Sequence, residues 1–544
     1  MRLLQPMVCD ITPNEITARL FVSKPGWIPR TVAASLGLIL GIAVGGASAH
    51  DPDVSAAQQT VIRNLQPFAD PTGAVATFDV NGRLDTQSAF FQSLGTNGRS
   101  CATCHVANQA FSLSATNIRE RFASTRGRDP LFAPVDGANC PDAKADDYNG
   151  HSLLLEHGLI RISLTVPANA QFSLSVVHDP YGCALVTDPG SGQLVASVYR
   201  RPLPTTNLHF LSAVMFDGRE TVEPLTSITT FGANLQADLT HQAQTAIAVH
   251  FQAVQIPTAE QLADIVDFEL GLYTGQVWDR SAGFLHAGGA KGGPLNLAHE
   301  GYYPGINDVL GADPHAVPFN SSSMTMFAGW ANVGFSIDEE GPEGRPSEFG
   351  GRDSPPSFER GPARREIAAG EVLFNTKPLT ISAVRGLNDN ATLGKPAAFQ
   401  GTCTSCHDAP NVGDHSLPLP LDIGVGHSPL PGFENDPNVD KGLAELDEPN
   451  LPVFLVSGCP SPFSAGQPVS FYTTDPGKAL VSGQCSDLNR VKGPILRGLA
   501  ARAPYFHNGA AATLLQAVNF YNQRFSMNLT EEQKRQLVAF LNSL

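Results

Sequence analysis

The sequence predicts a mainly α-helical fold of two related domains, with long irregular loops and a small β-hairpin insert. A short motif supports this first: Cys101-Ala102-Thr103-Cys104-His105 occurs again as Cys403-Thr404-Ser405-Cys406-His407. Helix-start signals and helically spaced apolar residues accompany each copy. Stretches rich in glycine, proline, asparagine and aspartate separate these segments and are typical of loops.

The repeated motif is the pattern of covalent c-type haem attachment. Each thiol adds to a haem vinyl group, and the adjacent imidazole becomes an axial ligand of the iron. With 9 cysteines and 15 histidines in 544 residues, chance predicts on the order of 0.004 such motifs. A zinc site using both cysteine pairs, or packed thiols, would not require a histidine after each pair. The sequence therefore predicts two haem c groups, held by Cys101, Cys104, His105, Cys403, Cys406 and His407.

The first 49 residues have the organisation of a signal peptide. Arg30 precedes an apolar run over 32–46, and Ala47-Ser48-Ala49 is a small-residue cleavage pattern. The run is short for a membrane span, although an uncleaved N-terminal anchor is the alternative. We expect an exported, periplasmic protein with no stable membrane span after cleavage. Haem c is normally attached outside the cytoplasm, which fits this location.

Four further cysteines lie outside the haem motifs, at Cys140, Cys183, Cys459 and Cys485. An oxidising compartment permits Cys140–Cys183 and Cys459–Cys485 as disulfides. The sequence alone does not fix this pairing.

Composition limits the class of partner. The formal net charge of -16 argues against a nucleic-acid partner and permits a basic protein partner. With 42% hydrophobic and 16% charged residues, the chain can bury a sizeable core. A length of 544 residues favours two or three domains.

The first half of the chain contains signals for two helices and for a pair of strands. Residues 50–80 show little periodicity, and a short helix is predicted over 84–94 before the first motif. Apolar residues alternate around 172–176 and 194–198 on either side of a turn at 179–182, which predicts the β-hairpin insert. Thr258 and Gln261 form a capping box for a helix that buries Leu262, Ile265, Val266 and Leu272.

The second half repeats the helical pattern. A Gly-, Pro- and Ser-rich stretch over 281–362 predicts an irregular connection, followed by a helix near 364–374. Later helices start at Thr513 and at Thr530, the latter capped with Gln533 and burying Leu537, Leu541 and Leu544. The predicted organisation is a first haem domain over 50–280, the connection over 281–362 and a second haem domain over 363–544.

Two further segments complete a family resemblance. They are Met215-Phe216-Asp217-Gly218-Arg219 and Ala503-Pro504-Tyr505-Phe506-His507-Asn508-Gly509. With the two haem motifs, they make residues 85–544 resemble the bacterial di-haem cytochrome c peroxidase superfamily. That superfamily also contains the methylamine dehydrogenase maturation enzyme and the di-haem rubber oxygenases. The combination is specific for the family but not for a substrate.

The resemblance implies a role for each haem. His105 would be the proximal ligand of the haem that reacts with peroxide or oxygen, and His407 that of the electron-transfer haem. The family's distal ligand to the second haem falls on Tyr521, where the peroxidases have methionine and the maturation enzyme has tyrosine. Tyr521 also lies on an apolar helix face and would suit a packed core position. His507 and Met527 are the other candidate ligands.

This sequence departs from the peroxidases at two places. Phe216 stands where they have an electron-relay tryptophan, and no acid follows Gln242-Ala243, where they have a distal glutamate. His250 falls near that place and could be an acid–base group, a sixth iron ligand or a hydrogen-bonded buried histidine. Arg219 would pair with a haem propionate or with a neighbouring acid. Family calcium, near Arg502–Pro504, is possible here.

The resemblance implies a periplasmic di-haem oxidoreductase. Hydrogen peroxide or oxygen would react at the first haem, with electrons passing through the second. The partner would be a small soluble electron donor, of cytochrome c or cupredoxin type, or an organic substrate. An oxygenase or oxidase of an organic or protein substrate, and a non-catalytic di-haem electron carrier, are the alternatives.

Overall fold

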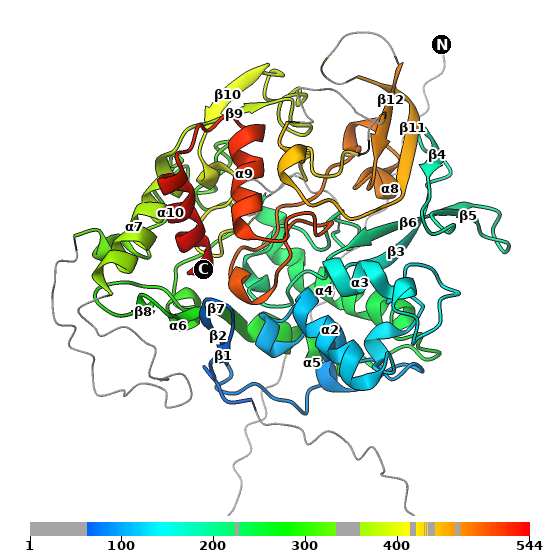
Figure 1. The fold of residues 1–544 in the computed structure, drawn as a ribbon, viewed down its shortest axis with the longest axis horizontal. Coiled ribbons are helices and arrows are strands. Elements are labelled where there is room, and N and C mark those ends of the chain that lie inside the picture. Colours follow the sequence, from blue (N-terminus) through cyan, green and yellow to red (C-terminus); the bar gives the residue numbers. More distant parts are fainter. Residues whose placement is uncertain are drawn as a thin grey trace, which may run out of the picture. The chain divides into compact units, whose positions relative to one another are not determined.

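The computed structural model describes residues 62–222, 228–332, 360–413, 420–428, 430, 432, 441–461, 463 and 468–544. These residues all belong to one structural unit (Figure 1). The predicted signal peptide lies outside the described residues. Among the described residues, no helix is both long enough and apolar enough to cross a membrane.

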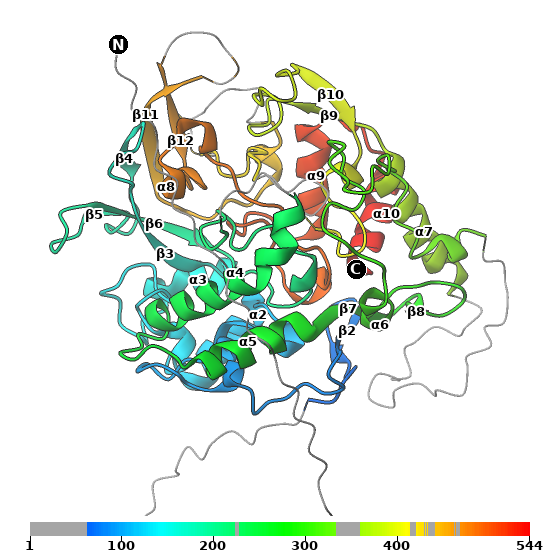
Figure 2. The ribbon, with the colours of Figure 1, turned by 180° about the vertical axis from the view of Figure 1, so that it is seen from behind.

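The helices are distributed along the whole described chain. They are α1 (Cys101–Cys104), α2 (Ala115–Thr125), α3 (Ser152–His157), α4 (Ile228–Val249), α5 (Ala259–Gly271), α6 (Pro294–Ala298), α7 (Gly361–Thr376), α8 (Ala479–Ser482), α9 (Leu514–Arg524) and α10 (Glu531–Asn542). Figures 1 and 2 both show α7, α9 and α10 gathered together, away from α2, α3, α4 and α5.

The prediction of a mainly α-helical fold is wrong. The described residues form four sheets, of strand order β1-β2-β7-β8, β10-β9, β12-β11-β4 and β3-β6-β5. The strands are β1 (Phe68–Ala69), β2 (Gly73–Asp79), β3 (Ile160–Thr165), β4 (Ser173–His178), β5 (Leu185–Thr187), β6 (Leu194–Arg200), β7 (Leu272–Asp279), β8 (Gly283–Phe284), β9 (Leu379–Ser382), β10 (Ala398–Gly401), β11 (Val453–Pro460) and β12 (Pro468–Thr473). Several are only two to four residues long, and β2 and β4 pair with the distant strands β7 and β11, so their local apolar pattern is weak evidence for a strand.

The predicted β-hairpin is also wrong, although both of its strands exist. β4 pairs with β11, with Leu174 opposite Val456, while β6 pairs with β3 and β5. Alternation identifies a strand but not its neighbour, because any half-buried strand with a matching apolar face can pair with it. Here β4 buries Leu174 against Phe454 and Val456, which come from the other end of the chain.

The segment before the first haem motif is less helical than predicted. Only Ala89–Phe91 form a 3₁₀ turn within 84–94. Tertiary contacts explain the difference, because the Asp264 carboxylate on α5 accepts the Ala89 N–H at 2.6 Å. Phe90 packs on Phe268 of α5, with ring centroids 4.8 Å apart. The lead-in over 50–80 also contains a strand, β2, which pairs with β7.

The strongest helix predictions are confirmed. Thr258 caps α5 through a capping box with Gln261, and Thr530 caps α10 through one with Gln533. α10 buries Leu537, Leu541 and Leu544 as predicted and packs along α7. The packing is close, since a Cβ on Gly370 of α7 would lie 2.0 Å from the carbonyl oxygen of Gln536.

Both disulfides that the spacing permitted are present. Cys140 is bonded to Cys183, and Cys459 is bonded to Cys485. The four cysteines of the two haem motifs are free thiols. The second disulfide lies in the core between β4, β6, β11 and β12.

Candidate functional site

The first haem motif forms a single helical turn. Ser100 and Thr103 cap it reciprocally, and the His105 N–H donates to the Cys101 carbonyl at 2.9 Å. This turn places both thiols and the imidazole on the wall of one cavity. The His105 ring lies with Nδ1 3.2 Å from the Phe111 carbonyl, which leaves Nε2 as the nitrogen with the lone pair. Burial lowers the pKa of His105 to about 4, so the ring is neutral, as a metal ligand must be.

The second haem motif repeats this geometry. Thr402 and Ser405 cap a 3₁₀ turn over Cys403–Ser405, and the His407 N–H donates to the Cys403 carbonyl at 3.0 Å. Cys403, Cys406 and His407 line a second cavity. Burial lowers the pKa of His407 to about 4, so this ring is neutral as well. Its Nδ1 has no hydrogen-bond partner among the described residues.

The two cavities share one wall. The residues that line both are Arg201, Pro202, Leu203, Phe216 and Lys492. Phe216 is held there because the Lys492 N–H donates to its carbonyl at 2.8 Å, and the Lys492 ammonium donates to the Ala213 carbonyl at 2.8 Å. The residue that replaces the family's relay tryptophan therefore stands between the two cavities.

The residues present fit haem c. Beyond the thiols and the neutral imidazoles, the cavities are lined mostly by apolar side chains. Two of the buried guanidinium groups on their walls, Arg201 and Arg502, have no ion pair with a carboxylate among the described residues. Among the described residues, both donate only to backbone carbonyls. Burial lowers the pKa of Arg201 to about 9 and that of Arg502 to about 10. Buried cations without carboxylate partners are suited to haem propionates.

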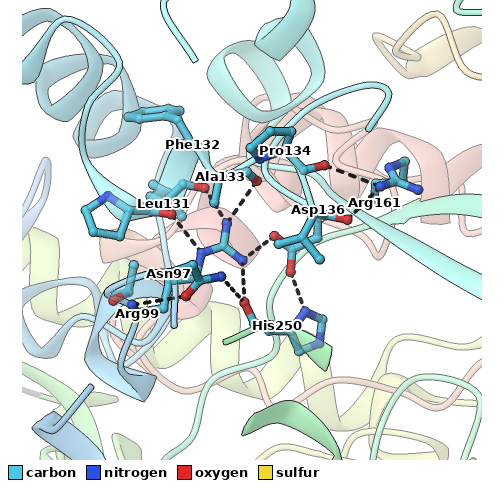
Figure 3. Close-up of polar contacts among 12 residues, drawn as sticks. Asn97, Arg99, Leu131, Phe132, Ala133, Pro134, Asp136, Arg161 and His250 are labelled. Carbon is cyan, nitrogen blue, oxygen red and sulfur yellow. Dashed lines mark hydrogen bonds and ion pairs between the residues drawn. The ribbon is translucent and has the colours of Figure 1, made fainter. Parts of the chain in front are cut away.

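His250 lies directly after α4 and lines the first cavity together with His105. Its Nδ1 hydrogen-bonds to Asp136, whose other carboxylate oxygen accepts from Arg99 (Figure 3). Asp136 and Arg99 were not recognised in the sequence as site residues. The pairing joins positions 114 residues apart, and no local pattern marks it.

A second unpredicted group in the first cavity is Glu269 on α5. The side chain is buried, and its Oε2 has no hydrogen-bond partner among the described residues. Burial raises its pKa to about 8. The cavity therefore has a carboxyl group despite the missing acid after Gln242-Ala243, but this carboxyl comes from a different helix.

Arg219 also lines the first cavity. Its Nη1 lies 3.0 Å from both carboxylate oxygens of Asp217, and its Nε lies 3.9 Å from Glu220. The structural ion pair that was one alternative is therefore present. Because Arg219 also lies on the cavity wall, its side chain can contact a haem propionate as well.

The three candidate distal ligands of the second haem all line the second cavity, namely Tyr521, Met527 and His507. The Tyr521 ring stacks on Phe525 at 5.7 Å, so it is also part of an aromatic cluster. Burial raises its pKa above the ordinary range of a phenol. His507 lies with its ring 6.0 Å from Phe216, beside the wall between the cavities.

The described residues contain no cluster of three or more His, Cys, Asp or Glu side chains that could hold a metal ion. A calcium ion bound through backbone carbonyls near 502–504 stays a prediction.

Paired cysteines followed by a buried neutral histidine, at the wall of a largely apolar cavity, are the arrangement expected of a c-type haem-binding protein. No family model matches the chain. The chain is 33% identical over 157 residues to the cytochrome-c peroxidase IdrP2 of Denitromonas iodatirespirans, covering 27% of this chain and 36% of that one. It is 29% identical over 160 residues to the IdrP2 of Pseudomonas sp. (strain SCT), covering 27% and 38%. It is 38% identical over 69 residues to the cytochrome c551 peroxidase of Nitrosomonas europaea, covering 12% and 21%.

These similarities confirm the resemblance that the motifs indicated. The matched part of the chain is related to the bacterial di-haem cytochrome c peroxidase superfamily. The matches span little more than a third of the two IdrP2 relatives and about a fifth of the third.

Proposed function

We propose that the protein is a periplasmic di-haem c-type oxidoreductase that reduces hydrogen peroxide at the haem held by Cys101, Cys104 and His105. Electrons would reach it through the haem held by Cys403, Cys406 and His407. The observation that carries the proposal is the pair of cavities, each with one attachment motif, on either side of a wall containing Phe216. The names of the relatives support peroxide as the oxidant.

The difference between the cavities supports the assignment of roles. The first is lined by Asp136, His250 and Glu269, which can hold or move protons, and by Arg219, which can donate hydrogen bonds to a polar substrate. The second is lined largely by apolar and aromatic side chains. Peroxide reduction consumes protons and electron transfer does not, so the cavity that carries these titratable side chains suits the reacting haem.

Each group in the chain has a defined task in this proposal. His105 and His407 would hold the haem irons, and the haems would supply the redox chemistry. Arg201 and Arg502 would bind the haem propionates. Phe216 keeps the cavities apart and apolar. The net charge of -16 favours a small soluble donor with a basic face.

The alternative in the same class is an oxygenase or oxidase of an organic or protein substrate. Phe216 favours it, because phenylalanine is much harder to oxidise than the relay tryptophan that it replaces. Electron transfer between the haems would then be slower than in a peroxidase.

The deciding measurement is low-temperature EPR of the ferric protein before and after hydrogen peroxide, combined with peroxide consumption in the presence of reduced cytochrome c. We expect one high-spin and one low-spin signal, loss of both with peroxide, and two donor electrons consumed per peroxide. Two low-spin signals that peroxide leaves unchanged would mean a di-haem electron carrier. A peroxide reaction without turnover of the donor would favour the oxygenase or oxidase.

A further inference from the structure

We propose that Asp136 and Arg99 are positioning residues that hold His250 as the proton-accepting group of the first cavity. This inference rests on the proposed function and adds to it the residues that move the peroxide proton. The arrangement is drawn in Figure 3.

The imidazole ring is fixed through its Nδ1. One carboxylate oxygen of Asp136 accepts from His250 Nδ1, and the other accepts from Arg99 Nη1. A carboxylate can only accept, so Nδ1 of the neutral ring carries the hydrogen and Nε2 carries the lone pair. The side chain of His250 is 24% exposed, whereas those of Asp136 and Arg99 are 5% and 1% exposed. The His250 ring is thus the most exposed of the three side chains, and it lies on the cavity wall.

The backbone of His250 is held by the segment that leads into the first haem motif. Asn97 Nδ2 and Arg99 Nη1 donate to the His250 carbonyl at 2.8 and 3.2 Å. Thr96 extends this contact by donating its N–H to the Phe251 carbonyl at 3.0 Å. The backbone of His250 is therefore bound directly to Asn97 and Arg99, and its ring is linked to Arg99 through Asp136.

This segment ends two residues before Cys101, the first haem attachment point. Two residues span at most about 7 Å, so Arg99 lies close to Cys101, the cysteine that would attach the haem. Arg99 is itself fixed by donating to the Pro130 and Leu131 carbonyls at 2.7 and 2.8 Å. The same short piece of chain thus sets the positions of the attachment point and of His250.

Asp136 is held in its ionised form. Burial would raise its pKa, but the hydrogen bond and charge of His250 and the charge of Arg99 lower it below the ordinary value. A buried carboxylate with two such donors orients the imidazole and stabilises the imidazolium when the ring takes a proton. The loop that carries Asp136 is also held by Arg161, which donates to the Val135 carbonyl at 2.6 Å.

The chemical step is a single proton transfer. His250 Nε2 takes a proton from hydrogen peroxide in the cavity, so that one O–H bond breaks and one N–H bond forms. The products are the hydroperoxide anion and the imidazolium. The imidazolium then holds the proton that the departing oxygen of the peroxide needs.

Cyanide tests this step without turnover. Hydrogen cyanide is protonated at neutral pH and must lose its proton to bind ferric haem, so the same acceptor should speed its binding. Carbon monoxide binds ferrous haem without any proton transfer. Stopped-flow association rates of both ligands with the haem-loaded protein therefore separate proton transfer from changes in shape or access.

His241 of α4 and Glu220 form a matched control pair. His241 Nδ1 lies 2.5 Å from the Glu220 carboxylate, but its side chain is 68% exposed and it does not line the cavity. We expect His250→Ala and Asp136→Asn to slow cyanide binding roughly 100-fold, the lower end for a lost general base. Carbon monoxide binding should change less than about twofold, and His241→Ala and Glu220→Gln should change neither rate.

Three results would overturn the proposal. The first is cyanide binding that is unchanged in His250→Ala or Asp136→Asn. The second is an equal loss for cyanide and carbon monoxide, which would mean a purely structural role. The third is cyanide binding that appears only in His250→Ala, which would make His250 an iron ligand in the native protein. If Asp136→Asn does not fold, His250→Gln decides between these results.

This test fails separately from the proposed function. A cyanide effect in a protein that does not reduce peroxide would keep His250 as the proton acceptor and remove peroxide as the substrate. Peroxide turnover that is unaffected in His250→Ala would keep peroxide as the substrate and remove His250 as the proton acceptor.

Discussion

At the scale of single residues, the first cavity contains two carboxyl groups with opposite protonation states. Asp136 is buried with a histidine and an arginine and stays ionised, whereas Glu269 is buried without a partner among the described residues and is protonated at neutral pH. Surroundings rather than residue type decide the state of each carboxyl.

Glu269 gives a prediction about stability and pH. Its pKa rises from 4.5 to about 8 in the folded protein, so the folded state holds a proton that the unfolded state releases. Stability should therefore fall as pH rises between about 4.5 and 8. Glu269→Gln cannot ionise, so its melting temperature should decline less over that range than the wild type's.

Thermal unfolding of the haem-loaded proteins at a series of pH values measures this difference. Glu260→Gln is the control, because Glu260 is an exposed residue on the same helix. Parallel wild-type and Glu269→Gln curves would mean that Glu269 is ionised in the folded protein.

Tyr521 gives a prediction about the second haem. Its ring lines the second cavity. If the phenol binds the iron, Tyr521→Phe should change the absorption and EPR spectra of one haem only. Tyr505→Phe is the control, because Tyr505 lines the same cavity but its hydroxyl donates to the Leu499 carbonyl at 3.2 Å. Spectra that change in Met527→Leu and not in Tyr521→Phe would assign the ligand to Met527.

At the scale of secondary-structure elements, the haem cavities depend on close helix packing. α7 and α10 enclose the second cavity through Phe374, Leu537 and Leu541, and they approach each other at Gly370. Glycine is required at that point by space rather than by backbone conformation, because the backbone there is helical.

Gly370→Ala should therefore destabilise the protein. The added Cβ would lie 2.0 Å from the Gln536 carbonyl oxygen, and forcing α7 and α10 apart should cost about 1–3 kcal/mol despite alanine's better helix propensity. Urea unfolding measures the change. Gly301→Ala is the control, because a Cβ there meets nothing within 4 Å. Equal midpoints for the two variants would show that the helices can move apart freely.

Elements with local signals were predicted well from the sequence, and those without were not. The capping boxes at Thr258 and Thr530 were found because a cap and its partner lie three residues apart in the sequence. The strand β4 was found, but its pairing with β11 was missed because the partner lies almost 280 residues away. The helix expected over 84–94 was replaced by a turn because Asp264 captures the Ala89 N–H.

At the scale of the whole molecule, a buried charge network connects the two halves of the chain. Arg200 on β6 donates to Asp217 at 2.5 Å and to Asp475 at 2.6 and 2.9 Å. Asp217 follows Phe216 in the wall between the cavities, and His507 lies 3.8 Å from Asp475. The network thus connects the wall to both halves of the chain.

Removing its centre should be costly. Arg200→Met leaves Asp475 buried without its arginine and Asp217 paired only with Arg219, and we expect a loss of about 3–5 kcal/mol in the free energy of unfolding. Arg535→Met removes the exposed ion pair with Glu532 and should cost at most about 1 kcal/mol. Denaturant unfolding of both variants, followed by haem absorption and by far-UV circular dichroism, compares the two. A cost for Arg200→Met as small as for Arg535→Met would mean that the buried network adds little to stability.

The sequence by itself determined the capped helices and the relationship to the peroxidases, and it predicted the haem attachment residues, because each depends on residues a few positions apart whose spacing the chemistry fixes. It also permitted, without fixing, the disulfide pairing that the structure contains. Only the tertiary structure decided the sheet pairing, the shared wall at Phe216 and the partners of His250. These depend on contacts between distant segments, such as Asp136 with His250, which are selected by burial and charge pairing after the chain has folded and leave no periodic signal in the sequence.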